Sequence, residues 1–566
     1  MGRVIYVPNI YLHIQEVMKV AEFMDLLRNK STGGHNVSLT ENGAIGYRTT
    51  GKALLDLNFS VASLRNEEES TIIEQWYDAY QYHPELALKW LFYVRDIRQG
   101  MGEKRLFKII LKWMAKHEPN VIKPLIIPEI MGEYGCWKDI FELFDTPLED
   151  TALRCIYTQL ASDIDDCKNN KPISLLAKWM PSINTSSNET RKKAKKIQAN
   201  LVLTEEGYRR ILSKLRKYLK VVERDMSDNK WSEIDYKTVP SVANMRYTKS
   251  FMNHDSERRK KYLIDVASGK EKINSKDLYP YQISSELNLN FLRKMYGYQV
   301  RKMFNGKFER SSVENVKTFL EENSADLNFL EGMWKNLPNL VTSDANILVI
   351  RDGSGSMCRN IEGTRTALDV ADSLTLYFAE RLKGAYHNTF ITFSSQPEVV
   401  TIPDTVIYEG NEVPATLLDK EAFLSNYSDY TNTNLEKVFD LILSIAVSNN
   451  LTQDELPTNL LIVSDMEFDN ATVPANRNDA LFEIIDRKFK NAGYNMPKLI
   501  FWNVNSRTKT IPVCENENGL ILVSGFSINI LKMVMSNKLD PYEALLETLN
   551  SERYARITYE VCTDHP

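Results

Sequence analysis

The sequence is poor in the residues that most often bind transition metals. Six cysteines (136, 155, 167, 358, 514 and 562) are spread over 566 residues without a Cys-x-x-Cys pair, and there are only seven histidines. This spacing argues against a disulfide framework, a zinc site or a histidine-based metal enzyme. Because a reducing compartment suits such a chain, we expect the protein to be cytoplasmic.

Long apolar runs are also missing. No stretch of 18 uncharged apolar residues occurs, so the sequence predicts no transmembrane helix and no membrane partner. The first eight residues, 1–8, do not begin the long apolar segment of a secretory signal. Hydrophobic residues make up 43% and charged residues 26% of the chain, which is typical of a globular protein with a buried core. At about 150 residues per domain, the length favours two to four domains.

The modest net charge of −5 conceals two oppositely charged parts. Residues 1–340 carry 52 Lys and Arg against 44 Asp and Glu, whereas residues 341–566 carry 18 against 31. Within the first part, residues 151–310 hold 33 basic and 18 acidic side chains. This asymmetry indicates two modules with different partners.

The first module, which we place at 1–340, is predicted to be helical. Apolar residues recur at helical spacing over 17–27, 71–82, 84–94, 103–116, 121–131, 151–164, 208–220 and 313–322. The breaks between them are short and polar, as in stacked helical pairs, so we predict an α-helical, HEAT-like solenoid. An irregular helical domain is the alternative, because no repeat period is evident.

The second module, placed at 341–566, alternates strands and helices. Strands are expected at 346–350, 388–393, 398–402, 459–463, 498–504 and 519–523, and helices at 367–383, 435–446, 479–490, 528–536 and 541–551. This alternation predicts a doubly wound, mostly parallel sheet with helices on both faces. The overall fold class is therefore α followed by α/β.

Oxygen-bearing side chains follow the first of these strands. Asp352, Ser354 and Ser356 are separated by glycines that allow a tight bend, and ligands of doubly wound sheets bind at such strand ends. Carboxylate and hydroxyl oxygens are hard ligands that suit Mg²⁺, or Mn²⁺, better than zinc or copper. A flexible turn without a ligand is the alternative for this loop taken alone.

Two later loops complete a resemblance. Thr433 precedes the predicted helix at 435, and Asp465 follows the strand at 459–463. Asp-x-Ser-x-Ser, Thr-Asn-Leu and Ser-Asp in this order resemble the metal-ion-dependent adhesion site of von Willebrand factor A domains. The resemblance spans roughly residues 344–560 and implies one divalent cation, most simply Mg²⁺, held by Asp352, Ser354, Ser356, Thr433 and Asp465. Thr431 competes with Thr433, because Thr-Asn occurs twice.

The sequence shows no catalytic constellation. Ser354 lies between adjacent glycines, whereas the nucleophile elbow of hydrolases needs glycines two positions away on each side. In adhesion-type sites a partner's carboxylate often completes the metal coordination. The resemblance therefore implies a docking surface for an acidic side chain and no enzyme activity.

Two basic runs lie in the first module. They comprise Arg191, Lys192, Lys193, Lys195 and Lys196, and then Arg258, Arg259, Lys260 and Lys261. Solvated helix faces are one interpretation. Basic surface with interleaved aromatic residues is also typical of proteins that bind structured or single-stranded RNA. Trp179 and Trp231 could contact such a ligand, although tryptophan side chains are more often buried in the core.

Helical repeats followed by an adhesion-type domain resemble Ro autoantigen and its TROVE relatives, which bind small RNAs. Short sequence motifs in the first module resemble instead those of a large domain-of-unknown-function family with the same two-part organisation. They are Thr40–Gly43 with Thr50-Gly51, Tyr93–Asp96 with Gly100–Glu103, Ala177–Ser182, Val239–Ser241, and His254-Asp255 with Glu257-Arg258.

The combined prediction is a non-enzymatic RNA-binding or ribonucleoprotein scaffold protein with a cation-dependent docking site. The alternative is a cation-dependent protein adaptor without a nucleic-acid ligand. RNA binding follows here from likeness of layout rather than from a recognised RNA site.

Overall fold

The computed structural model describes residues 36–292, 298–303, 305–341, 346–393, 396–428, 434–469, 481–512, 520–526 and 540–560. The helices expected at 17–27 and 528–536 lie outside these residues. The chain forms two compact units that are interleaved in sequence. One contains residues 1–87, 279–323 and 339–549, and the other contains 88–278, 324–338 and 550–566.

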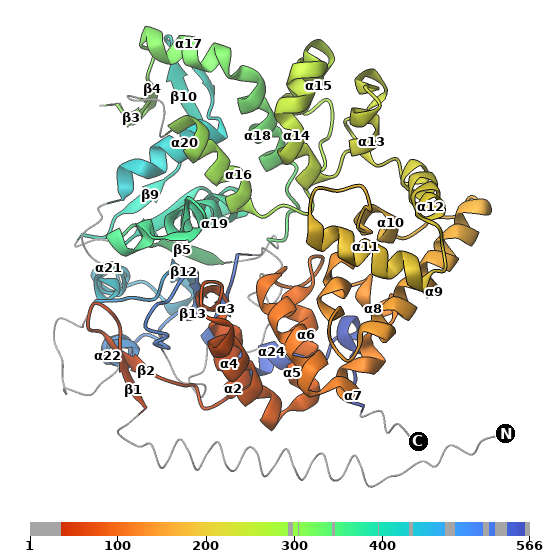
Figure 1. The fold of residues 1–566 in the computed structure, drawn as a ribbon. Coiled ribbons are helices and arrows are strands. Elements are labelled where there is room, and N and C mark those ends of the chain that lie inside the picture. Colours follow the sequence, from red (N-terminus) through yellow and green to blue (C-terminus); the bar gives the residue numbers. More distant parts are fainter. Residues whose placement is uncertain are drawn as a thin grey trace. The chain divides into compact units, whose positions relative to one another are not determined.

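A six-stranded sheet forms the core of the first unit (Figure 1). Its strands are β5 (Ile347–Arg351), β8 (Thr389–Thr392), β9 (Val399–Thr401), β12 (Asn459–Ser464), β13 (Lys498–Asn503) and β14 (Leu520–Ser524), in the order β14-β13-β12-β5-β8-β9. All neighbours are parallel except β8 and β9. The order 3-2-1-4-5-6 is that of a doubly wound sheet, whose direction of strand addition reverses between β5 and β12.

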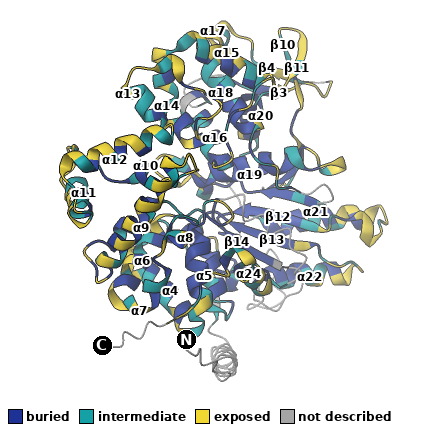
Figure 2. Cartoon of the chain, turned by 90° about the vertical axis from the view of Figure 1, so that its right-hand side faces the viewer, coloured by how far each residue is buried: buried dark blue, intermediate teal, exposed yellow. Residues whose placement is uncertain are grey.

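Helices cover both faces of this sheet. α19 (Ala367–Arg381) connects β5 to β8, whereas α22 (Leu481–Asn491) precedes β13 on the other side of the reversal. Because parallel connections are right-handed, these two helices lie on opposite faces, as Figure 2 shows. α21 (Leu435–Ser448) contacts α22, and α24 (Pro541–Leu549) contacts β14. The predicted doubly wound, mostly parallel sheet is confirmed.

The first unit also contains N-terminal elements. β1 (Val37–Leu39) and β2 (Ile45–Tyr47) form a hairpin, and α2 (Ala53–Phe59), α3 (Val61–Leu64) and α4 (Glu69–Tyr82) follow. Tyr47 pairs with Ile511 through backbone hydrogen bonds. The Asn503 amide donates to the Phe59 carbonyl at 2.9 Å. Segments more than 400 residues apart in sequence therefore share one core.

A small second sheet completes this unit. It has the order β11-β10-β4-β3, from β11 (Asn411–Pro414), β10 (Thr405–Tyr408), β4 (Phe308–Arg310) and β3 (Val300–Lys302). The adjoining helices are α16 (Pro280–Leu287), α17 (Glu314–Glu322) and α20 (Leu417–Leu424). The Arg310 guanidinium donates to both carboxylate oxygens of Asp419, at 2.8 and 2.6 Å. These strands were not predicted, because each is only three or four residues long.

The second unit is helical. Its helices are α6 (Arg105–His117), α7 (Pro119–Ile122), α8 (Pro128–Met131), α9 (Glu149–Lys168), α10 (Leu176–Trp179), α11 (Asn188–Asn200), α12 (Glu205–Tyr218), α13 (Val222–Ser227), α14 (Ser241–His254), α15 (Ser256–Ala267) and α18 (Ser324–Lys335), with α5 (Pro84–Arg95) leading into it. The prediction of a helical N-terminal region is confirmed. One predicted helix, 121–131, is instead α7, a 3₁₀ turn and α8, because Pro124 and Pro128 interrupt it.

The motif Tyr93–Asp96 with Gly100–Glu103 forms the end of α5 and the tight loop that follows it, within the second unit. A Cβ at Gly100 would lie 2.0 Å from the Tyr93 carbonyl oxygen, so only glycine fits there. The loop surrounds the buried Asp96 carboxylate, which accepts hydrogen bonds from the guanidinium of Arg553 at 2.7 and 3.0 Å and from the Tyr554 hydroxyl at 3.1 Å. Asp96 therefore holds the C-terminal segment against the helices of this unit.

A buried polar cluster lies behind β5 in the first unit. Arg351 pairs with Asp372 and also donates to the Ser428 hydroxyl at 2.9 Å. Nearby, one oxygen of Glu421 accepts from Ser284 at 2.5 Å, and its other oxygen has no hydrogen-bond partner within the described residues. Burial, with the charge of Asp372, raises the pKa of Glu421 to about 8.

We expect Asp96→Asn to destabilise the second unit by about 3 kcal/mol, because the partly buried Arg553 would lose its ion pair. Thermal or urea unfolding measures the change. The control is Glu133→Gln, which removes an exposed partner of the same arginine and should cost less than about 1 kcal/mol. Equal losses for the two variants would contradict the role given to Asp96.

We expect Glu421 to make stability fall as pH rises from about 5 to 8. The folded protein holds the proton up to a pKa of about 8, whereas the unfolded chain releases it near 4.5, so each pH unit between these values destabilises the fold by up to about 1.4 kcal/mol. Glu421→Gln keeps a neutral side chain of the same shape. Its unfolding midpoint should exceed that of the native protein at pH 8 and match it near pH 5. A constant difference across this range would refute the assignment.

Candidate metal centre

The end of two neighbouring strands defines the candidate site. β5 and β12 run parallel, with Arg351 opposite Val463, so the residues that follow them emerge side by side. This is the point where strand order reverses, and the connections diverge to opposite faces and leave a crevice. Asp352 follows β5, Ser464 ends β12 and Asp465 follows it.

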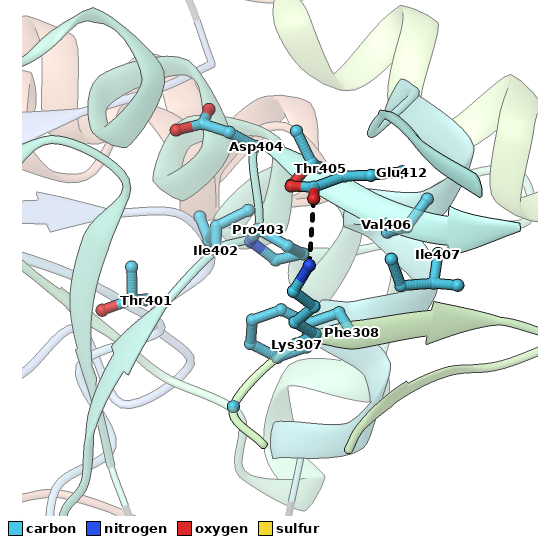
Figure 3. Close-up of a pocket in the computed structure, with 11 residues that line it drawn as sticks. Lys307, Phe308, Thr401, Ile402, Pro403, Asp404, Thr405, Val406, Ile407 and Glu412 are labelled. Atoms are coloured by element: carbon cyan, nitrogen blue, oxygen red, sulfur yellow. Dashed lines mark hydrogen bonds and ion pairs between the residues drawn. The ribbon is translucent and has the colours of Figure 1, made fainter. Parts of the chain in front are cut away.

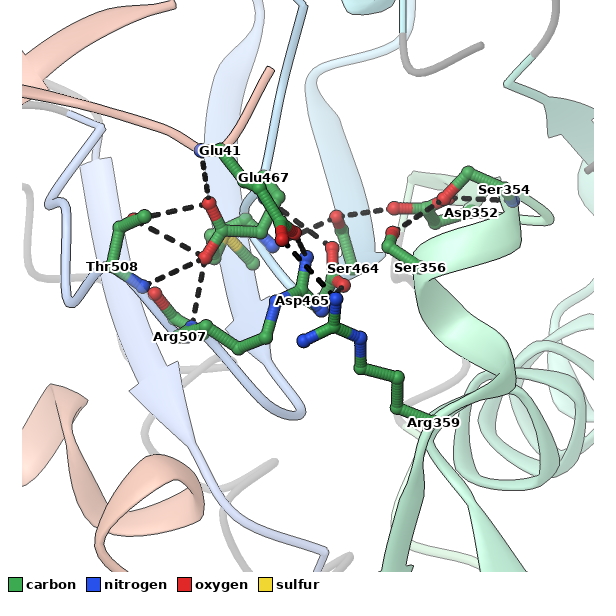
Figure 4. A network of polar contacts seen from close by, with 12 residues as sticks. Glu41, Asp352, Ser354, Ser356, Arg359, Ser464, Asp465, Glu467, Arg507 and Thr508 are labelled. Carbon is green, nitrogen blue, oxygen red and sulfur yellow. Dashed lines mark hydrogen bonds and ion pairs between the residues drawn. The ribbon is translucent and has the colours of Figure 1, made fainter. Parts of the chain in front are cut away.

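The loop after β5 folds around the carboxylate of its first residue, Asp352. Asp352 is fully buried, and one of its oxygens accepts the backbone N–H of Ser354 at 3.0 Å. The hydroxyl oxygens of Ser354 and Ser356 lie 3.0 Å apart. A Cβ at Gly353 would lie 3.0 Å from the Arg351 guanidinium and 3.2 Å from the Tyr427 carbonyl, which explains the preference for glycine. Figure 4 shows the three side chains turned towards the loop after β12.

The loop after β12 completes the group. The Ser464 hydroxyl donates to the second oxygen of Asp352 at 2.5 Å. The Asp465 carboxylate lies near Asp352 and Ser356, and both influence its pKa. The structure thus brings together four of the five predicted ligands: Asp352, Ser354, Ser356 and Asp465. The fifth, Thr433, and its competitor Thr431 lie outside the described residues. Their neighbour Asn434 caps α21 by accepting the Lys437 N–H at 3.1 Å.

The electrostatics of this group favour a cation. Burial raises the pKa of Asp352, and burial together with the Asp352 charge raises the pKa of Asp465 to about 7. Two buried carboxylates that repel one another would be stabilised by a positive ion between them. Among the described residues, no group of three or more His, Cys, Asp or Glu is placed to hold a metal. Serine hydroxyls would therefore supply part of the coordination, as a hard ion requires.

Four charged residues beside the group were not predicted as site residues (Figure 4). Arg507 donates to Asp465 at 2.9 Å and also pairs with Glu41. Arg359 reaches the other oxygen of Glu41 at 3.2 Å. Glu467 had a sequence signal, since it follows Asp465 by two positions. Arg359 follows Ser356 by three positions, whereas Glu41 and Arg507 approach from segments distant in sequence, which no local pattern reveals.

Glu467 organises these loops around the site. Its buried carboxylate accepts the backbone N–H groups of Glu41 at 2.7 Å, Arg507 at 2.8 Å and Thr508 at 2.9 Å. Between Asp465 and Glu467, Met466 adopts a left-handed φ of 63°, and its N–H is held by the Ser464 hydroxyl at 3.0 Å. A non-glycine residue in this conformation is strained, and such strain is common at functional sites.

The predicted basic runs lie on helices of the second unit. In α11 most of the charge is already paired. Lys193 contacts Glu189 at 2.8 Å, and Lys196 contacts both Asp145 and Glu149. Lys195 approaches Glu205 at 3.8 Å, and Arg191 donates to the Thr185 carbonyl at 2.8 Å. Lys192 is exposed and has no ion-pair partner among the described residues.

The second run, in α15, divides into inward and outward residues. Arg259 is fully buried among Tyr236, Phe251, Tyr262 and Phe329, so it belongs to the core and cannot contact RNA there. Burial lowers its pKa to about 10. Arg258 is tied to Asp255 and to two backbone carbonyls. Lys260 and Lys261 are exposed.

Both tryptophans considered as ligand contacts are only partly buried. Trp179 lies beneath the ammonium groups of Lys138 and Lys178, at 4.7 and 5.4 Å from its ring centre. Trp231 stacks on His254 with ring centres 4.2 Å apart. Neither is a core residue.

A separate cavity of about 260 Å³ lies in the first unit, next to the small sheet (Figure 3). Apolar side chains such as Phe308 and Ile402 form part of its lining, and Lys307 pairs with Glu412 at its edge. It shares no residue with the candidate metal centre.

The structure therefore combines a helical unit with a doubly wound sheet, and the sheet carries oxygen-bearing side chains at the carboxyl ends of its strands. The chain belongs to the family described as a domain of unknown function (DUF2828), whose model matches residues 40–157 and 152–346. A second domain of unknown function (DUF7788) matches residues 346–558. These matches confirm the predicted resemblance to an uncharacterised family with a two-part plan.

Two further comparisons gave matches. An uncharacterized protein, L728, of Acanthamoeba polyphaga mimivirus is 29% identical over 553 residues, covering 91% of this chain and 87% of the viral protein. The crystal structure of the Deinococcus radiodurans RO (RSR) protein aligns with a TM-score of 0.41 and 12% identity, over 88% of this chain and 99% of that one. Across the described residues, no helix is both long and apolar enough to span a bilayer.

We expect one Mg²⁺ or Mn²⁺ to bind this centre, and Asp352→Asn to weaken binding at least tenfold, because a buried carboxylate ligand is lost. Calorimetric titration of the purified protein measures the affinity. The matched control is Asp454→Asn, an exposed carboxylate that precedes β12 at the opposite end of the strand. Equal affinity for both variants would place the cation elsewhere.

Proposed function

We propose that this protein is a non-enzymatic docking scaffold that binds an acidic side chain of a partner protein through a divalent cation. The observation that carries the proposal is the convergence of Asp352, Ser354, Ser356 and Asp465 from two strand ends. With Thr433 from the α21 loop, these residues would hold the cation. When bound, the cation would supply a positive charge with room for a further oxygen ligand.

The surroundings of the site support docking rather than catalysis. The nearest charged groups, Arg507, Arg359 and Glu41, are paired with one another or with Asp465. Within the described residues no histidine hydrogen-bonds to Ser354 or Ser356, and their hydroxyls contact one another instead. Arg359 and Arg507 both pair with the Glu41 carboxylate, so this edge of the site already binds one carboxylate and suits the same group on a partner.

RNA binding by the second unit is the second candidate function. The excess of basic residues over 151–310 favours it. So does the exposure of Lys192, Lys260 and Lys261, none of which has an ion-pair partner among the described residues. Such lysines neutralise phosphates without having to break an existing ion pair. The two functions concern different units and can coexist, as in a ribonucleoprotein scaffold.

The docking proposal predicts a partner that is retained on immobilised protein in Mg²⁺ and released by EDTA. Asp352→Asn should lose this partner, whereas Asp454→Asn should retain it. The captured protein should lose binding when one Asp or Glu in its contact segment is changed to Asn or Gln. If neither EDTA nor Asp352→Asn reduced the amount of partner retained, the proposal would be contradicted.

The RNA proposal predicts that protein purified at low salt carries nucleic acid. Its 260/280 nm absorbance ratio should be high and should fall after a wash at high salt, because phosphate contacts are weakened by counterions. Reversing the two exposed lysines of α11, Lys192 and Lys195, should weaken the binding. Unchanged affinity would remove α11 from the RNA-contacting surface, and protein free of RNA at low salt would oppose the function itself.

A further inference from the structure

We propose that a basic cleft between α9 and α12 is the place where the protein binds the phosphate backbone of single-stranded RNA. This inference rests on the RNA-binding function proposed above and names its site. The cleft has a volume of about 710 Å³ and lies within the second unit. Its lining includes Lys214, Lys217, Lys220, Tyr218, Asn170 and Pro172. None of these residues belongs to the two basic runs that stand out in the sequence.

The three lysines of this cleft differ from most lysines of α11 in having no acidic partner. Lys214, Lys217 and Lys220 are all exposed, and none forms an ion pair within the part of the chain that the structure describes. In α11, by contrast, Lys193, Lys195 and Lys196 are all paired with carboxylates. An anion that binds the cleft gains three free ammonium groups and displaces no acidic side chain.

The fold holds these lysines on one side of α12. Tyr208, Leu212 and Leu215 are buried on the opposite side. Arg216 turns inward and donates to the carbonyls of Ala177 and Met180, each at 2.8 Å. Lys214 and Lys217 are one turn apart, where helical neighbours have Cβ atoms about 5–6 Å apart. They therefore form a row of positive charge along the helix surface.

The row continues past the end of α12. Lys220 adopts a left-handed φ of 49°, and its N–H is bonded to the Lys217 carbonyl at 3.1 Å. This turn keeps Lys220 beside the last residues of the helix. Lys168 and Lys171, both exposed at the end of α9, add positive charge nearby. The acids in the last turns of α9 have polar partners: Asp163 accepts from Ser174 and Gln159, Asp165 from Asn169 and Asp166 from Ser162.

Tyr218 indicates why the ligand would be RNA rather than an acidic protein. Its hydroxyl donates to the Lys171 carbonyl at 2.9 Å, which fixes a partly exposed ring in the lining of the cleft. A fixed aromatic face next to a row of lysines can stack a base while the lysines contact phosphates. An acidic peptide would use the lysines but gain little from the ring.

The test uses the full chain and a fluorescein-labelled 20-nucleotide oligouridine, with binding followed by anisotropy at several salt concentrations. We expect K214Q/K217Q/K220Q to raise Kd at least tenfold and to reduce the slope of log Kd against log salt by about 2, since each single-strand phosphate contact contributes about 0.7. Y218L should raise Kd about tenfold without changing that slope. The matched control is K112Q/K116Q, which removes two exposed lysines one turn apart on α6 of the same unit.

Each alternative result has one meaning. If the native protein binds oligouridine and the triple variant binds it equally well, the cleft is not the site and the RNA function stands. If the native protein does not bind at any salt concentration, the RNA function fails and the cleft assignment fails with it. If the triple variant loses a labelled polyglutamate peptide as fully as oligouridine and Y218L has no effect, the cleft is an acidic-protein site. Unfolding midpoints of all variants should match that of the native protein.

Discussion

The parallel pairing of β5 with β12 is the contact on which the candidate metal centre depends. These strands are more than 100 residues apart in sequence, yet their pairing sets Asp352 beside Ser464 and Asp465. The connection after β5 leaves the sheet towards one face and the connection after β12 towards the other, so a crevice forms beyond the carboxyl ends of these strands. If these two strands were not neighbours, no arrangement of the loops would bring the two carboxylates together.

Arginine compensates several of the buried carboxylates in this protein. Arg351 pairs with Asp372, Arg95 with Asp139 and Arg553 with Asp96, and in each pair the carboxylate is largely buried. A guanidinium can donate to several acceptors at once and is easier to dehydrate than an ammonium group. Arg351, for example, binds a carboxylate, a carbonyl and a hydroxyl in one place. Lysines, in contrast, stay mostly at the surface.

Surface lysines fall into two groups that sequence composition cannot separate. Those of α11 neutralise nearby acids, whereas those at the end of α12 face an open cleft without partners. The densest basic run is therefore not the most available positive charge. What matters for a polyanion is the charge left after internal pairing, and this quantity depends on helices that meet only in the folded unit.

The sequence by itself determined the alternation of strands and helices after residue 346, because apolar runs and periodic helices are local patterns. It also identified the strand-end loops, since glycine, serine and aspartate mark them directly. Tertiary structure alone decided that Arg507 and Glu41 join the loop around Asp465, that Arg259 is buried and that Lys214, Lys217 and Lys220 remain unpaired. The physical reason is that burial and ion pairing are set by neighbours distant in the chain. Local periodicity reports only which face of an element is apolar.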